Sequence, residues 1–232
     1  MFLSLSLPYQ YVYITACAIL AVFWFLIFLA RKDLRHEMLW ASFWGMPFGL
    51  IDYFLVPRYW NPESIFGLIK KYGVGPESFI FFFLMAGIVS VVYEFLWRKK
   101  TAKSRVRKNL RYFPFLIGAA VFCLLLFVFP DSAIYALIAG GAAGALFTIY
   151  FRPDLWRQVI ASAFIFSLLY FFVLFLVNQI FSGMVQNFYN LKNLWGILVF
   201  GLPLEEIAVA FFAGAFWSTF YECIKSYKDR RL

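Results

Sequence analysis

Seven apolar stretches of helical length follow one another along the chain, separated by short polar segments. Each approaches the ~20 residues that an α-helix needs to cross the hydrocarbon core of a bilayer. The first stretch lacks a basic start and a small-residue cleavage site, so we expect a retained helix and not a signal peptide. The pattern predicts an all-α membrane protein with seven transmembrane helices, near residues 11–30, 38–56, 78–97, 113–129, 132–151, 159–181 and 204–224.

The basic residues between these stretches alternate from one side to the other. The connections after the first, third and fifth stretches, together with the C-terminal tail, hold 17 of the 21 Lys and Arg residues, and the remaining connections hold 4. The positive-inside rule then predicts an N-terminus outside and a C-terminus in the cytoplasm. Because the basic residues flank apolar stretches, we attribute the net charge of +9 to topology and expect no nucleic-acid partner.

Composition narrows the chemistry further. The chain is 64% hydrophobic and 14% charged, whereas a soluble domain is about half apolar and a quarter charged. One histidine, His36, and three cysteines without motif spacing give no support to a metal site or a disulfide framework. The glycines at residues 140–144 lie inside an apolar stretch and predict a helix-packing face, not a phosphate loop. No flavin or nicotinamide motif is visible, so we expect no cofactor.

The chain also repeats itself. A shift of 128 positions places residues 73–78 on residues 201–206 and Glu94 on Glu222, and a second echo relates residues 31–34 to residues 152–155. Because the two copies start four stretches apart, they should share one orientation and be related by an axis along the membrane normal. We therefore predict a first three-helix repeat over residues 1–100, a basic linker with a connecting helix over 101–131, and a second three-helix repeat over 132–232.

A carboxylate within a membrane is costly and is by default a candidate functional group. Glu77, Glu205 and Glu206 lie at the predicted starts of the third and seventh helices. Acidic residues in a first turn also suit the helix dipole, and for Glu77 this structural role is an equal alternative. Two adjacent acids before a fully apolar helix favour function at Glu205 and Glu206.

Three other acids lie away from the starts of the third and seventh predicted helices. Glu94 and Glu222 end their helices about 25 Å from the glutamates at the starts, so they cannot share a small site with them. We expect them to be structural and to pair with Lys99, Lys225 or a loop arginine. Asp52, in the second stretch, has no acidic counterpart in the second copy; it is either a partner of the glutamates or a hydrogen-bonded core residue.

Together these features resemble the membrane-integral lycopene cyclases, in the form that fuses the two subunits of the heterodimeric bacterial and archaeal enzymes, and the cyclase part of fungal bifunctional enzymes. The family's Pro-x-Glu-Glu signature is matched by Pro203-Leu204-Glu205-Glu206. The first copy departs from it, because Gly75-Pro76-Glu77-Ser78 keeps one glutamate and shifts the proline. Trp60-Asn61-Pro62 fits the loop that precedes the signature.

The resemblance implies a carotenoid cyclase that acts on a polyene dissolved in the membrane of a prokaryote, such as lycopene. An acid protonates a terminal double bond, the neighbouring double bond attacks the carbocation, and a base removes a proton, with no net redox change. This predicts Glu205 or Glu206 as donor and Glu77 as base or partner, with Asp52 and Pro203 in contact with substrate. The alternatives are a non-catalytic carotenoid-binding protein or partner subunit of the same fold, and a proton or ion transporter.

Overall fold

The computed structural model describes residues 7–97, 101–103, 111–225 and 227–229. Within them the chain is almost entirely helical, and the two small sheets have two strands each. The helices are α1 Val12–Ala30, α2 Arg35–Gly45, α3 Asp52–Leu55, α4 Leu68–Tyr72, α5 Pro76–Trp97, α6 Phe113–Val128, α7 Ala133–Phe151, α8 Trp156–Ile180, α9 Met184–Phe188, α10 Leu204–Trp217 and α11 Phe220–Lys225; the strands are β1 Thr101–Lys103, β2 Leu198–Val199, β3 Leu202–Pro203 and β4 Tyr227–Asp229.

Five helical segments of the described chain are long and apolar enough to cross a membrane, which confirms an all-α membrane protein. They are Tyr9–Ala30, Pro76–Trp97, Pro130–Phe151, Pro153–Ile180 and Leu204–Lys225. The fourth predicted helix is the shorter α6 of 16 residues. The second predicted helix is divided into α2, a 3-10 segment over Met46–Ile51 and α3. The count of seven spans therefore stays a prediction.

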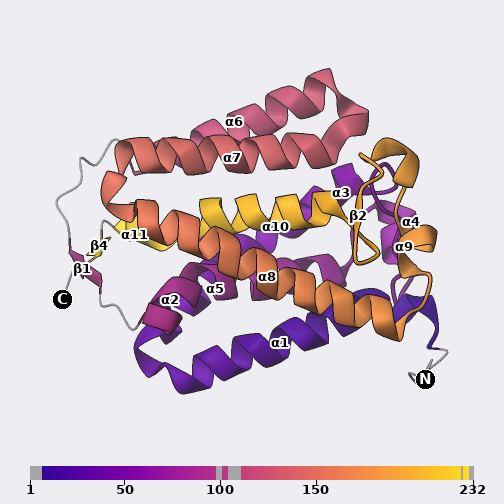
Figure 1. The fold of residues 1–232 in the computed structure, drawn as a ribbon, viewed down its shortest axis with the longest axis horizontal. Helices are drawn as coiled ribbons and strands as arrows, with labels where there is room; N and C mark the ends of the chain where they lie inside the picture. The colour runs from indigo at the N-terminus through magenta and orange to yellow at the C-terminus, as the bar shows by residue number, and fades with distance from the viewer. Residues whose placement is uncertain (1–6, 98–100, 104–110, 226, 230–232) are drawn as a thin grey trace.

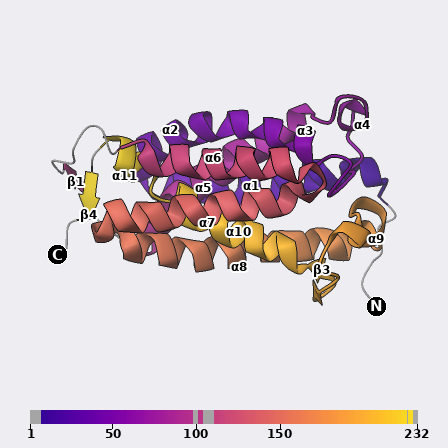
Figure 2. The ribbon, with the colours of Figure 1, turned by 90° about the horizontal axis from the view of Figure 1, so that it is seen from above.

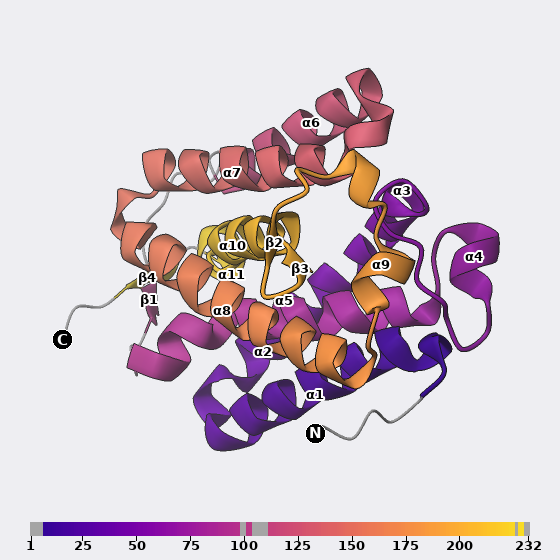
Figure 3. The ribbon, with the colours of Figure 1, turned by 45° about the vertical axis from the view of Figure 1, so that its right-hand side comes forward.

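The long helices form two groups that lie side by side (Figures 1 and 2). In the first, α1 and α2 pack on α5; in the second, α7 and α8 pack on α10. Contacts of α5 and α1 with α8 join the groups, and α6 packs mainly on α7. Figure 3 shows α10 enclosed by α7, α8 and α5. The chain's two repeats are thus in contact through α5 and α1 of the first group and α8 and α10 of the second.

The two ends of the bundle differ. One end, here called the loop end, holds α4, α9 and the β2–β3 hairpin (Figure 2). The other, called the basic end, holds Arg31, Arg152 and Lys225 at the connections after α1 and α7 and at the end of α11. The basic end corresponds to the side that the charge pattern predicts to be cytoplasmic. Lys99, a predicted partner of Glu94, lies outside the described residues.

Small residues allow the helices of the first group to approach closely. A Cβ on Gly45 of α2 would overlap the Cβ of Ala86 on α5. The next residue of α5, Gly87, faces Trp24 and Ser42, whose side chains share a 3.1 Å hydrogen bond between α1 and α2. In the second group, the predicted packing face is confirmed, because Gly140 meets the backbone of α6.

Replacing Gly45 with alanine should therefore force α2 and α5 apart. We expect a loss of about 1–3 kcal/mol of stability, as is typical of overpacking, seen as a lower thermal midpoint in detergent. The control is Ala18→Val, which enlarges an exposed position of α1. Equal midpoints for Gly45→Ala and the wild type would contradict the close contact.

Candidate active site

A cavity of about 670 Å³ lies between the two groups of helices. It extends from Tyr189 and Glu206 near the loop end to Phe220 and Ile224 near the basic end. Its walls are overwhelmingly apolar, and α6 closes one side through Phe115 and neighbouring residues. Sites for small molecules have this character: a largely apolar enclosure with a few convergent polar groups.

Glu206 is the polar centre of the cavity wall. Its side chain is buried at the first turn of α10, where three tyrosines from separate segments donate hydrogen bonds to it. Tyr59 and Tyr189 donate to Oε1 at 2.7 and 2.9 Å, and Tyr170 donates to Oε2 at 2.8 Å. Three hydroxyl donors fit within the acceptor capacity of a carboxylate, whose two oxygens offer about four lone-pair sites.

Two of these tyrosines lie in connecting segments, outside the long helices. Burial, reinforced by the neighbouring Glu206 charge, raises the pKa of the Tyr59 and Tyr189 hydroxyls well above their usual value. Both groups therefore stay protonated and remain hydrogen-bond donors across the physiological pH range.

Asp52 lines the same cavity from the start of α3. It is 2% exposed and accepts a 2.9 Å hydrogen bond from Tyr13. Glu206 lines the same cavity, so the two carboxyl groups share one apolar enclosure. The structure thus brings together two carboxyl groups, one from each repeat.

Glu205 and Glu77 occupy equivalent positions in the two repeats and make equivalent contacts. The Oε1 atom of Glu77 accepts from the backbone N–H of Ile65 at 3.1 Å. The Oε1 atom of Glu205 accepts from the backbone N–H of Trp195 and from the hydroxyl of Tyr135. Each glutamate therefore ties the loop before its helix to the helix start. Neither residue lines the cavity within the described part of the chain.

The remaining sequence candidates lie elsewhere. Pro203 pairs with Leu198 in the β2–β3 hairpin and precedes α10, and it is absent from the cavity lining formed by the described residues. Glu94 and Glu222 lie at the basic end, where they meet Glu37, a residue that the sequence analysis did not single out. This separation agrees with the expectation that they share no site with the acids at the helix starts.

The lycopene cyclase family model matches the chain twice, over residues 10–96 and 132–224. Together these matches cover more than three quarters of the 232 residues. The chain belongs to the lycopene cyclase family. Searches of curated proteins and of solved structures found no match. One match in each half fits the fused, two-repeat form of these cyclases.

The four residues of the Pro203-Leu204-Glu205-Glu206 signature, on which the lycopene cyclase resemblance rests, make different contacts in the structure. Only Glu206 of its four residues lines the cavity. The three tyrosines around Glu206 were missed by the sequence analysis, because they come from positions 59, 170 and 189 and share no local motif. Single tyrosines in an aromatic-rich membrane protein give no signal of their own.

Because Glu205 contacts the loop before α10, we predict that the protein needs this residue for stability and not for catalysis. Glu205→Ala should lower stability by about 1–3 kcal/mol, because it removes the acceptor of the Trp195 N–H and leaves the Tyr135 hydroxyl only the more distant Asn193 carbonyl oxygen. Glu205→Gln keeps an oxygen acceptor and should retain most of the stability. Thermal midpoints in detergent test this, and a glutamine variant as unstable as the alanine variant would contradict the assignment.

Proposed function

We propose that this protein cyclises a linear end of a membrane-dissolved polyene such as lycopene by acid–base catalysis. The observation that carries the proposal is the placement of two buried carboxyl groups, Asp52 and Glu206, in one apolar cavity. Membership of the lycopene cyclase family supports the same reaction.

The reaction needs one proton to enter the substrate and one to leave it. Protonation of the terminal double bond gives a carbocation, the neighbouring double bond forms the ring bond, and loss of a proton restores a double bond. Atoms and electrons balance without an oxidant or reductant, so the proposal includes no redox cofactor and no metal in catalysis. The product is an isomer of the substrate.

Asp52 and Glu206 act together as proton donor and acceptor in this proposal. Two carboxyl groups enclosed in the same low-dielectric cavity resist being ionised at the same time, so one of the two carries a proton in this proposal. The pair gives up this proton at the start of the reaction and regains one at the end. Asp52 thereby takes the place that the sequence analysis gave to Glu77.

The surroundings suit a carbocation. Tyr13, Trp60, Phe81 and Tyr170 line the cavity beside the two carboxyl groups, and aromatic faces attract cations most strongly where water is excluded. Within this group, edge-to-face contacts join Tyr13 to Trp60 and Phe81 to Tyr170. These contacts fix the ring orientations before substrate enters.

The dimensions of the cavity support a long, narrow substrate. Glu206 and Ile224 line it 18 residues apart on α10 and α11, a helical rise of about 27 Å. A polyene with one end at the carboxyl pair would extend along α10 towards the basic end. Entry from the bilayer fits this substrate, and we place the protein in a prokaryotic plasma membrane with seven spans, the N-terminus outside and the basic end in the cytoplasm.

Expression in a lycopene-accumulating bacterium, with chromatography of the pigments, tests the reaction. We expect mono- or bicyclic carotenes from the wild type and a loss of about 10²–10⁴-fold in cyclisation rate for Asp52→Asn and for Glu206→Gln, because neither amide exchanges a proton. Glu77→Gln and Glu205→Gln are the matched controls and should remain active. Lycopene that stays linear while co-purifying with the inserted wild type would support the non-catalytic alternative instead.

A second variant tests the path of the substrate. Ala213 lines the cavity about two helical turns from Glu206. Ala213→Phe should block the cavity there and abolish cyclisation of a 40-carbon polyene, while a shorter polyene with the same end group should still be cyclised. Equal activity on both substrates would contradict a path along α10.

A further inference from the structure

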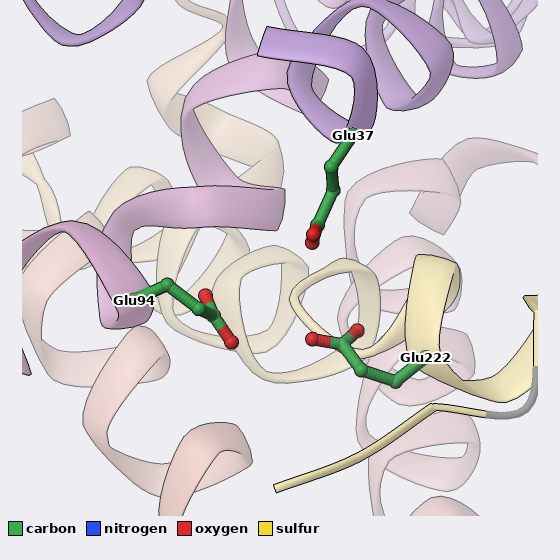
Figure 4. A group of neighbouring side chains, drawn as sticks. All are labelled: Glu37, Glu94 and Glu222. Atoms are coloured by element: carbon green, nitrogen blue, oxygen red, sulfur yellow. The ribbon is translucent and has the colours of Figure 1, made fainter. Parts of the chain in front are cut away.

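Three carboxyl groups converge at the basic end, away from the proposed active site. Glu37 from α2, Glu94 from α5 and Glu222 from α11 offer oxygen atoms that all lie within 4.8 Å of one another (Figure 4). The three residues are 6%, 2% and 0% exposed. They come from both repeats, so this cluster joins the two halves of the chain.

We propose that Glu37, Glu94 and Glu222 bind one hard divalent cation of the Mg²⁺, Mn²⁺ or Ca²⁺ class. All three ligands are carboxylates, the type that such cations prefer. Metal–oxygen distances of about 2.0–2.6 Å place two opposed ligands about 4–5 Å apart, which matches the spacing in the cluster. Small side-chain adjustments would complete the coordination.

Glu37 supplies an independent indication of a ligand. Its Oε1 atom is buried and has no hydrogen-bond partner among the described residues. Figure 4 shows the side chain reaching from α2 towards Glu94 and Glu222, with its oxygens in the space between the helices. A buried oxygen without a donor is costly, and a cation at this point would satisfy it.

In the second repeat, the position that corresponds to Glu37 holds an amide side chain and not a further acid. A shift of 121 residues relates Arg31 to Arg152 and Glu37 to Gln158. Gln158 donates to Glu222 Oε1 and to the Ser218 carbonyl oxygen, both at 2.7 Å. An amide here is hydrogen-bonded within the protein, whereas the carboxylate of Glu37 adds negative charge to two other acids.

The arginines at this end make matching contacts in both repeats. Arg31 forms a two-bond ion pair with Asp33 and donates to the Glu94 carbonyl oxygen. Arg152 forms the same ion pair with Asp154 and donates to the Glu222 carbonyl oxygen. These contacts hold the backbones of Glu94 and Glu222 in place and orient the helix ends that carry the cluster.

A cation at this position would stabilise the basic end of the cavity. Glu37 lies one helical turn from Trp40, and Glu222 lies between Phe220 and Ile224; these three neighbours all line the cavity. Trp40 and Phe220 also contact each other at a ring-centroid distance of 5.3 Å. The site would therefore connect α2, α5 and α11 without taking part in the proposed chemistry.

Mn²⁺ binding to the purified full-length protein tests the proposal. After treatment with a chelator, the wild type should bind one Mn²⁺ per chain by electron paramagnetic resonance, displaced by Mg²⁺ or Ca²⁺, and its thermal midpoint should rise with the cation. Glu37→Gln, which copies the Gln158 arrangement, should weaken binding at least about tenfold. Glu222→Gln removes a different ligand and should weaken binding likewise.

Glu63→Gln is the control, because Glu63 is an exposed carboxylate that pairs with Lys70 at the loop end. It should bind Mn²⁺ as the wild type does. A wild type that binds no Mn²⁺, or a Glu37→Gln variant with wild-type affinity, would overturn the cation site. A thermal midpoint that responds to pH and not to any of the three cations would show that the acids share protons instead.

Discussion

The structure depends on supplying most of its enclosed carboxyl groups with hydrogen-bond donors inside an apolar bundle. In a chain that is 64% hydrophobic, an unpaired buried charge is strongly destabilising. Glu206 is surrounded by three tyrosine hydroxyls, Glu77 and Glu205 accept backbone N–H groups, and Glu222 accepts from the amide of Gln158. These contacts also join distant segments, so the positions of the acids largely determine where loops and helix ends lie.

Divergence between the two repeats makes both proposed sites asymmetric. At the loop end, Glu206 of the second repeat corresponds to Ser78 of the first, and the first repeat supplies its carboxyl group to the cavity as Asp52. At the basic end the asymmetry is reversed, because Glu37 in the first repeat corresponds to Gln158 in the second. A symmetric pair of halves would place equal groups opposite each other, whereas these substitutions place unequal groups there.

Local patterns in the sequence predicted the helices and the acids at their ends, because apolar length and charge are local properties. Which adjacent glutamate faces the cavity was not predictable, since Glu205 and Glu206 lie about 100° apart and tertiary packing sets the helix rotation. The direction of the Asp52 side chain was not predictable either, because it also depends on how far the chain rotates about the helix axis before it. The six-residue 3-10 segment before it turns the chain by about 120° more than an α-helix would. Glu37 did carry a signal, because extending the match of residues 31–34 with residues 152–155 by three positions pairs it with Gln158.

The position of the carboxyl pair within the cavity bears on the number of rings that one binding event forms. Asp52 and Glu206 lie near the loop end, whereas the lining at the opposite end is formed by Trp40, Phe220 and Ile224. The basic-end carboxylates, Glu37, Glu94 and Glu222, do not line the cavity within the described residues, so they offer no second acid there. On the proposed function, one binding event therefore cyclises one end of the polyene. A bicyclic product then requires the monocyclic intermediate to leave, turn and enter again with its linear end at the pair. The cavity must accept a ring at its far end for that second reaction, which makes the width between α2, α6 and α11 the property that decides between one ring and two.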